Sequence, residues 1–192
     1  SRIKIDASSK KAIMSLLVDE CLVSDDTILA VKCTPKKQNI TSENLNDLFS
    51  NLKKKNNAKI TCWNFIWELI SENAEYIKRD FNDVFYEKDN YFETELGTTV
   101  INPYNVWIGD GAIMKPGVVI DATDGPVIID ENVKIMPNAV IIGPAYIGKG
   151  STIKVGAKIY EGTSIGPVCK IGGEVEETIF QGYTNKQHDG FL

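Results

Sequence analysis

The chain has 192 residues and a net charge of −5, with 21 Lys and Arg against 26 Asp and Glu. This length allows one or two domains with a substantial core, and the acidic balance argues against nucleic-acid or membrane-surface binding, which requires a basic face. No apolar run approaches the roughly 20 residues that span a bilayer, and no signal-peptide pattern is present. We therefore expect a cytoplasmic protein. Because the chain starts with Ser and both ends break off abruptly, we also expect it to be a piece of a longer one.

The first 95 residues predict a small α/β segment. Apolar residues at helical spacing indicate a helix in 8–19, and the β-branched run 27–33 indicates a strand that Pro35 closes. A second helix is expected from Ser42 to Leu52, with the Lys53–Asn57 cluster as its solvated end. The longest helical pattern covers residues 61–82 and predicts a helix that connects this segment to residues 96–192.

The four cysteines, Cys21, Cys33, Cys62 and Cys169, have neither the spacing of metal ligands nor that of a redox pair. All four lie in apolar surroundings, so we expect free thiols in a reduced, intracellular protein.

A six-residue repeat dominates residues 108–175. An apolar residue recurs in an unbroken series from Ile129 to Ile171, and Ile108, Met114 and Ile120 extend this series upstream. Four positions after each apolar residue stands a small or slim one, and on an extended chain these two sets of side chains face the same way. The residue before the slim one is glycine or asparagine in seven of ten hexads: Gly111, Gly117, Asn132, Asn138, Gly150, Gly156 and Gly162.

This repeat predicts a parallel β-helix, mainly β in class. Glycine and asparagine enter left-handed backbone conformations at low cost, so each hexad corresponds to a short strand that ends in a tight corner. A six-residue spacing does not stay on one face of an α-helix. The Asp121–Pro126 stretch adds three residues to the series, and we expect it to project as a loop. The pattern resembles the hexapeptide-repeat acyltransferases, which implies a left-handed coil.

Three motifs give a more specific resemblance. The first is the Trp63–Asn73 stretch continuing to Phe81, in which Asn64 replaces the usual Asp. The second comprises the stretches Pro103–Ala112 and Asp121–Val127, and the third is the segment Gln181–Leu192. Together they resemble a bacterial sugar-nucleotidyltransferase-like family, related to the bifunctional uridyltransferase/acetyltransferase that makes UDP-N-acetylglucosamine. The resemblance implies a nucleotidyltransferase domain, of which residues 1–95 are the tail, followed by a β-helix. No glycine-rich loop in this tail could cradle a triphosphate.

The resemblance implies a sugar 1-phosphate as one substrate. The second substrate is a nucleotide for nucleotidyl transfer, and acetyl-CoA or another acyl-CoA for acyl transfer. The implied assembly is a homotrimer. Magnesium is implied only for the missing nucleotidyltransferase part. No metal site is expected within this chain, because a β-helix zinc site of the carbonic-anhydrase type uses three histidines and the chain has one.

That single histidine, His188, is the candidate catalytic base, since acyl transfer needs a group that deprotonates the acceptor. The resemblance also allows another role: in the related enzyme the base lies in a Gly-His motif that would follow Leu192, which leaves His188 as a ligand contact or a surface residue. Tyr183, Asn185, Lys186 and Asp189 are candidate substrate-binding residues. The lysines that flank the inward positions should point outward, where they could meet coenzyme A phosphates: Lys115, Lys134, Lys154, Lys158 and Lys170.

A non-catalytic role remains as the alternative. Stacked coils offer flat, repetitive faces that associate readily, so the chain could be a trimeric assembly module.

Overall fold

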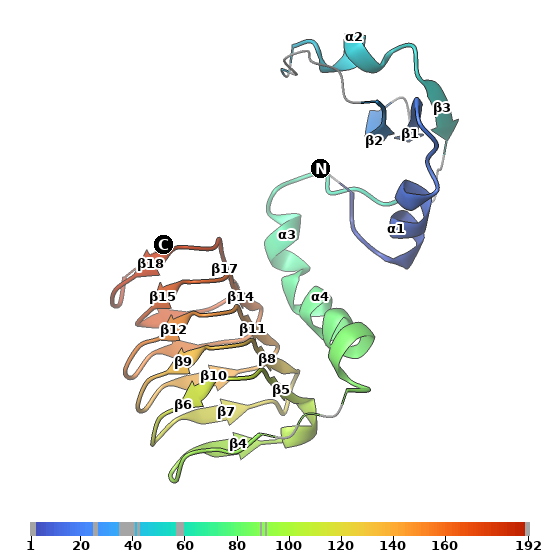
Figure 1. The fold of residues 1–192 in the computed structure, drawn as a ribbon. Coiled ribbons are helices and arrows are strands. Elements are labelled where there is room, and N and C mark those ends of the chain that lie inside the picture. The colour runs from blue at the N-terminus through green and yellow to red at the C-terminus, as the bar shows by residue number, and fades with distance from the viewer. Residues whose placement is uncertain are drawn as a thin grey trace. The chain divides into compact units, whose positions relative to one another are not determined.

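The computed structural model describes residues 3–24, 27–34, 41, 43–56, 60–88, 90 and 92–190 (Figure 1). The chain divides into two compact units, Ser1–Ile66 and Trp67–Leu192. This division falls earlier than the boundary near residue 95 that the sequence suggested. The helical residues 73–85 belong to the second unit because Ile77 and Phe81 pack on Ile128 of its β-sheet.

The first unit is a three-stranded sheet with two helices. Helix α1 (Ala7–Met14) begins at Asp6, whose carboxylate accepts a hydrogen bond from the backbone N–H of Ser9, and α2 covers Leu45–Phe49. Strand β1 (Glu20–Ser24) lies between β2 (Thr27–Lys32), which is antiparallel to it, and β3 (Lys53–Asn56), which is parallel. The core of this unit contains Ile3, Leu16, Leu22 and Ile60.

The lysine cluster that was expected to end a helix is instead strand β3. Lys53 to Lys55 are all exposed, so apolar periodicity could not reveal this edge strand. Its position is fixed by the backbone hydrogen bond from Lys53 to Asp19 (3.1 Å) and by an ion pair between Lys53 and Glu20 (3.5 Å). Pro35, which was expected to close the strand 27–33, and Ser42, which was expected to begin the second helix, lie outside the described residues.

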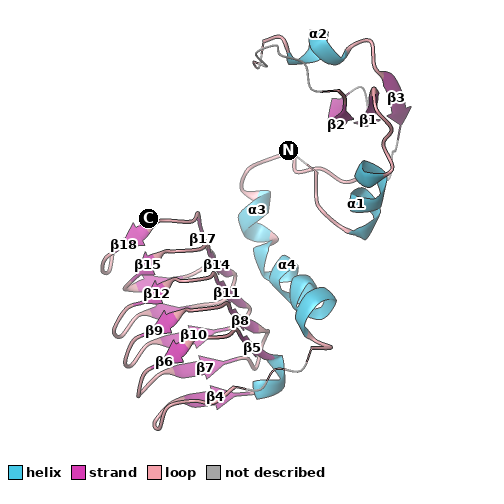
Figure 2. Cartoon of the chain, viewed as in Figure 1, coloured by secondary structure: helices cyan, strands magenta, loops and turns pink. Residues whose placement is uncertain are grey.

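The second unit is the predicted left-handed parallel β-helix, with five coils and three five-stranded sheets (Figures 1 and 2). The first sheet contains β4 (Thr99–Ile101), β7 (Val119–Asp121), β10 (Val140–Ile142), β13 (Lys158–Ile159) and β16 (Glu174–Val175). The second contains β5 (Val106–Ile108), β8 (Val127–Ile129), β11 (Ala145–Ile147), β14 (Thr163–Ile165) and β17 (Ile179–Phe180). The third contains β6 (Ile113–Met114), β9 (Lys134–Ile135), β12 (Thr152–Ile153), β15 (Lys170–Ile171) and β18 (Asn185–Lys186).

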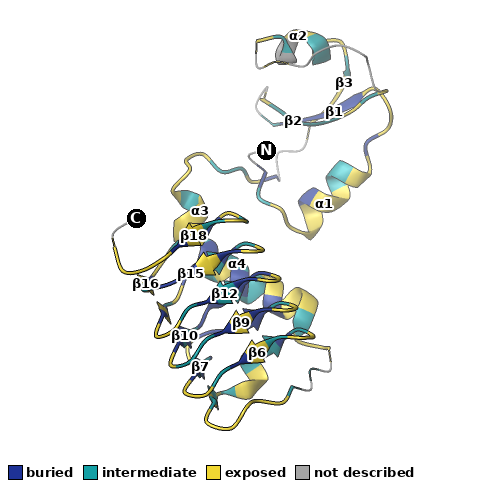
Figure 3. Cartoon of the chain, turned by 60° about the vertical axis from the view of Figure 1, so that its left-hand side comes forward, coloured by how far each residue is buried: buried dark blue, intermediate teal, exposed yellow. Residues whose placement is uncertain are grey.

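The apolar side chains of the repeat fill the axis of the coil. In the third sheet Met114, Ile135, Ile153 and Ile171 pair from one coil to the next, and each is at most 3% exposed. The slim residues Val133, Ser151 and Cys169 beside them are buried as well, so buried and exposed residues alternate along the strands (Figure 3). The predicted core and register are confirmed from Ile108 to Ile171.

The corners also follow the prediction. All seven glycines and asparagines named above have positive φ, between 57° and 81°. Val168 occupies an equivalent corner with φ 57°, although a branched side chain is strained there.

Replacing Gly156 by valine should destabilise the protein by about 1–2 kcal/mol. The corner has φ 66°, and an added Cβ would meet no atom within 4 Å, so the cost is conformational rather than steric. Gly156→Asn is the matched control, because Asn132 and Asn138 already occupy equivalent corners. Urea unfolding of both variants should separate them, and equal losses of stability would contradict this account of the corner.

Two coils depart from the regular length. Five residues, 122–126, join β7 to β8, so the predicted insertion indeed breaks the series at a corner. Between Ile171 and Val175 the step from one inward residue to the next is four residues, two fewer than in the regular repeat. Val175, which the six-residue pattern places in a slim position, pairs with Ile159 and continues the isoleucine column. The corresponding columns of the second and third sheets end in Phe180 and Lys186, which pair with Ile165 and Ile171.

The segment before the coil covers the second sheet. The expected helix 61–82 is shorter and broken into α3 (Glu68–Ser71), α4 (Asn73–Asp80) and a π-helical turn, η1 (Phe81–Phe85); a 3₁₀ turn, η2 (Pro103–Asn105), precedes β5. Ile77 and Phe81 pack on Ile128 of the sheet. The buried Asn73 anchors α4, since its amide donates to the carbonyl of Gly162 (2.7 Å) and its oxygen accepts from Ser164 (2.9 Å).

Candidate functional site

A pocket of about 380 Å³ lies at the corner where the third sheet continues into the first, in the last coils. Three segments line it: Lys154–Lys158 without Ala157, Gly172–Glu174, and Gln187–Asp189. It brings together the only histidine of the chain, two lysines and two carboxylates. Its size is within the range of small-molecule sites.

Three hydrogen bonds hold the segment around His188. The Lys154 ammonium donates to the carbonyl of Gln187 (3.0 Å), and the Lys186 ammonium donates to the carbonyl of His188 (2.8 Å). The backbone N–H of Glu174 donates to the carboxylate of Asp189 (3.2 Å). The segment 187–189 is therefore tied to three different strand ends.

Two glycines allow this segment to lie against the coil. A Cβ on Gly172 would come within 2.6 Å of the carbonyl oxygen of Gln187, and one on Gly173 within 2.7 Å of the backbone nitrogen of Asp189. Both contacts are shorter than real Cβ atoms tolerate, so larger residues here would displace the segment and with it His188.

The exposed imidazole of His188 has one defined hydrogen-bonding partner. Its Nδ1 lies 3.0 Å from the carbonyl oxygen of Asp189. A carbonyl oxygen only accepts hydrogen bonds, so this contact requires a proton on Nδ1. In the neutral ring the lone pair is then on Nε2, which is the state that a general base needs.

The first sheet adds a charged pair to the pocket wall. The Lys158 ammonium lies 3.2 Å from Glu174, which also accepts a hydrogen bond from the Tyr160 hydroxyl (2.9 Å). The hydrogen bond from Tyr160, and then the neighbouring Lys158, lower the pKa of Glu174. The hydrogen bond with Glu174 raises the pKa of Lys158. Glu174 is therefore ionised and paired near neutral pH.

The predicted site residues separate into three places. His188 and Asp189 line the pocket together with Lys154 and Lys158, two of the five lysines that could not be ranked from sequence. Tyr183 and Asn185 do not line it: Tyr183 is 81% exposed at a corner with φ 66°, and the Asn185 side chain accepts a hydrogen bond from Gln187 (2.8 Å). Lys186 points inward, is 8% exposed and continues the isoleucine column.

Gly172, Gly173 and Glu174 were missed as pocket residues. The signal that could have identified them is the Gly172-Gly173 pair, which stands where the regular six-residue series is interrupted. A doubled glycine at a break in a repeat indicates close approach of another backbone segment.

A further pocket of about 290 Å³ lies between α4 and the second sheet. Its polar groups pair with one another or with neighbours, as Ser164 does with Asn73 and as Tyr146 does with Asp130 (3.1 Å). Burial and the adjacent Asp130 charge raise the pKa of Tyr146 to about 12, so its hydroxyl remains protonated at neutral pH.

A family model and a curated relative each match part of the chain. The family model described as bacterial transferase hexapeptide (six repeats) matches residues 126–161. These residues lie in the coil, so its six-residue repeat is similar to that family over this stretch. The chain is also 35% identical over 82 residues to 2,3,4,5-tetrahydropyridine-2,6-dicarboxylate N-acetyltransferase of Staphylococcus aureus strain Newman, a match that covers 38% of this chain and 34% of that protein. The chain thus spans about a third of the length of this curated relative.

Among solved structures, the acetyltransferase domain of PglB from Neisseria gonorrhoeae FA1090 is similar, with a TM-score of 0.39 and 16% identity over 80% of this chain and 82% of that one. Within the described part of the chain, no helix is long and apolar enough to cross a membrane, and no group of three or more His, Cys, Asp and Glu side chains could hold a metal ion.

Proposed function

We propose that the coil is an acyltransferase domain that uses acetyl-CoA or another acyl-CoA, and that the pocket around His188 is its reaction site. The observation that carries this proposal is the position of the single histidine, which lies in a pocket with two lysines on a coil of transferase hexapeptide repeats. The acetyltransferase relative supports the reaction class.

In this mechanism His188 Nε2 accepts the proton of an acceptor amine or hydroxyl as the acceptor attacks the thioester carbonyl. The carbon–sulfur bond then breaks, a carbon–nitrogen or carbon–oxygen bond forms, and the imidazolium returns its proton to the departing thiolate. Lys158 is paired with Glu174, whereas the Lys154 ammonium binds the uncharged Gln187. Lys154 therefore places positive charge beside the pocket, which favours the negative charge that develops on the carbonyl oxygen.

The acceptor we propose is a sugar phosphate, and the whole protein would then also carry a nucleotidyltransferase domain and act on a nucleotide. Asp189 contacts the acceptor from the pocket wall, while Tyr183, Asn185 and the lysines of the outer faces contact parts of the ligands that extend beyond it. These assignments rest on the resemblance of the segment 181–192 to that enzyme family. Magnesium belongs to the nucleotidyltransferase domain in this scheme.

We also propose a homotrimer, since the first and third sheets present outward faces and exposed apolar corner residues such as Val168. Sedimentation at micromolar concentration tests this, and a monomer would contradict it.

The direct test is release of free coenzyme A thiol from acetyl-CoA by this 192-residue chain, with amino-sugar phosphates, free amino sugars and amino acids as acceptors. Acceptor-dependent thiol release that is greatest for the sugar phosphates is expected. Calorimetry with acetyl-CoA is the companion measurement. If well-folded trimer neither binds nor consumes acetyl-CoA, the coil serves assembly rather than catalysis.

A further inference from the structure

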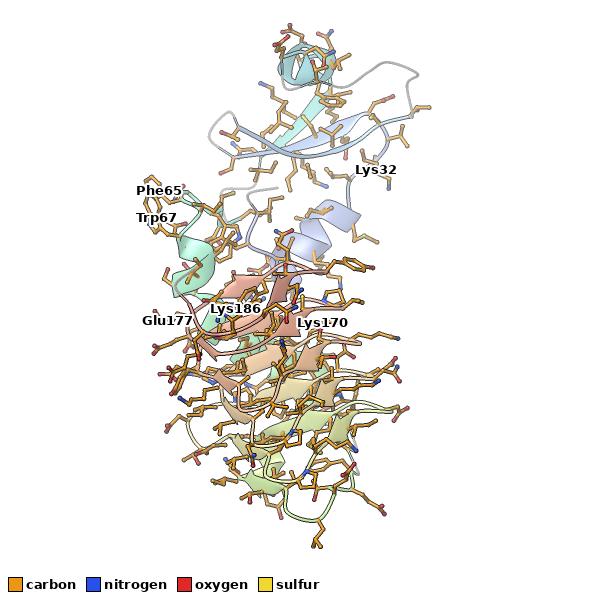
Figure 4. The ribbon with its side chains drawn as sticks, turned by 90° about the vertical axis from the view of Figure 1, so that its left-hand side faces the viewer. Lys32, Phe65, Trp67, Lys170, Glu177 and Lys186 are labelled. Atoms are coloured by element: carbon orange, nitrogen blue, oxygen red, sulfur yellow. The ribbon has the colours of Figure 1, made fainter. Side chains whose placement is uncertain are left out.

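Lys186 differs from the other lysines of the coil by facing its axis. It pairs with Ile171 in the third sheet and is 8% exposed, whereas Lys170 on the neighbouring strand is exposed. Both are labelled in Figure 4, near the C-terminal end of the coil. The aliphatic part of Lys186 extends the apolar column by one coil, and the ammonium lies above its end.

That ammonium joins two parts of the pocket wall. It donates to the carbonyl of Gly172 (3.0 Å) and to the carbonyl of His188 (2.8 Å), and both residues line the pocket. A charged donor makes stronger hydrogen bonds than a neutral one, and a buried charge that loses its partners is costly. The ammonium therefore has a strong preference for the arrangement in which the His188 backbone lies against Gly172.

We propose that Lys186 is a positioning residue: its buried ammonium fixes the His188 backbone, and thereby keeps the imidazole in the Nδ1–H form with Nε2 directed to the ligand. The contact between Nδ1 and the Asp189 carbonyl depends on the relative orientation of two successive residues, and Lys186 holds the peptide between them. The conclusion that Lys186 fixes the His188 backbone follows from these contacts alone. Its consequence for catalysis rests on the proposed acyl transfer.

The test uses the single histidine as an unambiguous NMR reporter in the full chain. In long-range ¹H–¹⁵N spectra of the neutral imidazole, the wild-type protein should show a protonated Nδ1. Lys186→Met keeps an apolar side chain in the column and removes the ammonium, so the protein should stay folded while His188 shifts to the Nε2–H form that free imidazoles prefer. Lys170→Met should leave the histidine spectrum unchanged.

A histidine spectrum identical in wild type and folded Lys186→Met protein would overturn the inference. A measurement without substitution covers the case in which the variant does not fold: the Lys186 ammonium protons should exchange slowly with water and show through-hydrogen-bond coupling to the Gly172 and His188 carbonyls. Ammonium protons that exchange as fast as those of Lys170 would equally overturn it.

Activity then separates this inference from the proposed function. If acyl transfer occurs, Lys186→Met should lower kcat about tenfold or more with little change in KM, because misplacement of a catalytic group affects the reacting geometry rather than binding. If the wild type shows no acyl transfer, the NMR results still decide whether Lys186 holds His188. If acyl transfer occurs and the spectra do not change, only the positioning role fails.

Discussion

Replacing Ile153 by alanine is expected to lower the free energy of unfolding by about 2–5 kcal/mol. The side chain has no exposed surface and lies in the middle of the third-sheet column, between Ile135 and Ile171 in the adjacent coils. Removing it leaves a cavity that the surrounding coils cannot close, because each backbone is hydrogen-bonded to the coils on both sides. Urea unfolding monitored by circular dichroism measures the loss.

Val155→Ala is the matched control for Ile153→Ala. It removes a similar aliphatic side chain two residues away, but Val155 is 64% exposed at a corner. Its effect should stay within about 0.5 kcal/mol, as for surface substitutions generally. Equal losses in the two variants would show that Ile153 does not face the axis of the coil.

The coil could be predicted because its information is local and repeated. Each hexad specifies one strand and one corner, so the inward position of Ile153 and the left-handed corner at Gly156 follow from residues nearby in sequence. The end of the coil is different. A strict six-residue period after Ile171 would place residue 177 in the apolar column. Val175 occupies that position instead, because the repeat is two residues shorter there. A period cannot predict where it is broken, since the break depends on contacts with the following segment.

The first unit was predicted less well, because its strands are identified by their partners. Strand β1 (Glu20–Ser24) is buried between β2 and β3, but its polar ends concealed it. Lys53 to Lys55 have the composition of a solvated helix end and become a strand only because β1 offers a free edge. The helix expected in 61–82 begins later because Thr61 accepts a backbone hydrogen bond from Lys4 and Cys62 forms a β-bridge with Ile3.

The candidate site was predicted in part. His188 was identified from its uniqueness, and the outward direction of Lys154 and Lys158 from the register of the hexads. Which lysines meet His188 could not be derived, because that depends on how segment 187–189 folds back on Gly172 and Gly173. The burial of Lys186 was also not predicted, since it is the one lysine that occupies a column position in the described part of the coil.

Replacing His188 by alanine is expected to lower kcat for acyl transfer by about 10²–10⁴-fold, the usual contribution of a general base. The imidazole is exposed within the pocket and donates to the Asp189 carbonyl through Nδ1, so Nε2 is the atom that can take a proton from the acceptor. Thiol release from acetyl-CoA with saturating acceptor measures the effect. Lys186 binds the backbone carbonyl of residue 188 and not the imidazole ring. The His188→Ala variant should therefore retain the backbone arrangement and the melting temperature of the wild type.

Two measurements distinguish a base from a ligand contact. Imidazole added to His188→Ala protein should restore part of the rate, since a free base can enter the space left by the side chain, whereas it should not stimulate the wild type. Lys149→Met, at a different corner of the coil, should retain wild-type kcat. A rise in KM with unchanged kcat and no rescue would place His188 among the residues that only bind ligand. Transfer would then depend on another base, because an interaction that stabilises the ground and transition states equally does not change the rate of the chemical step.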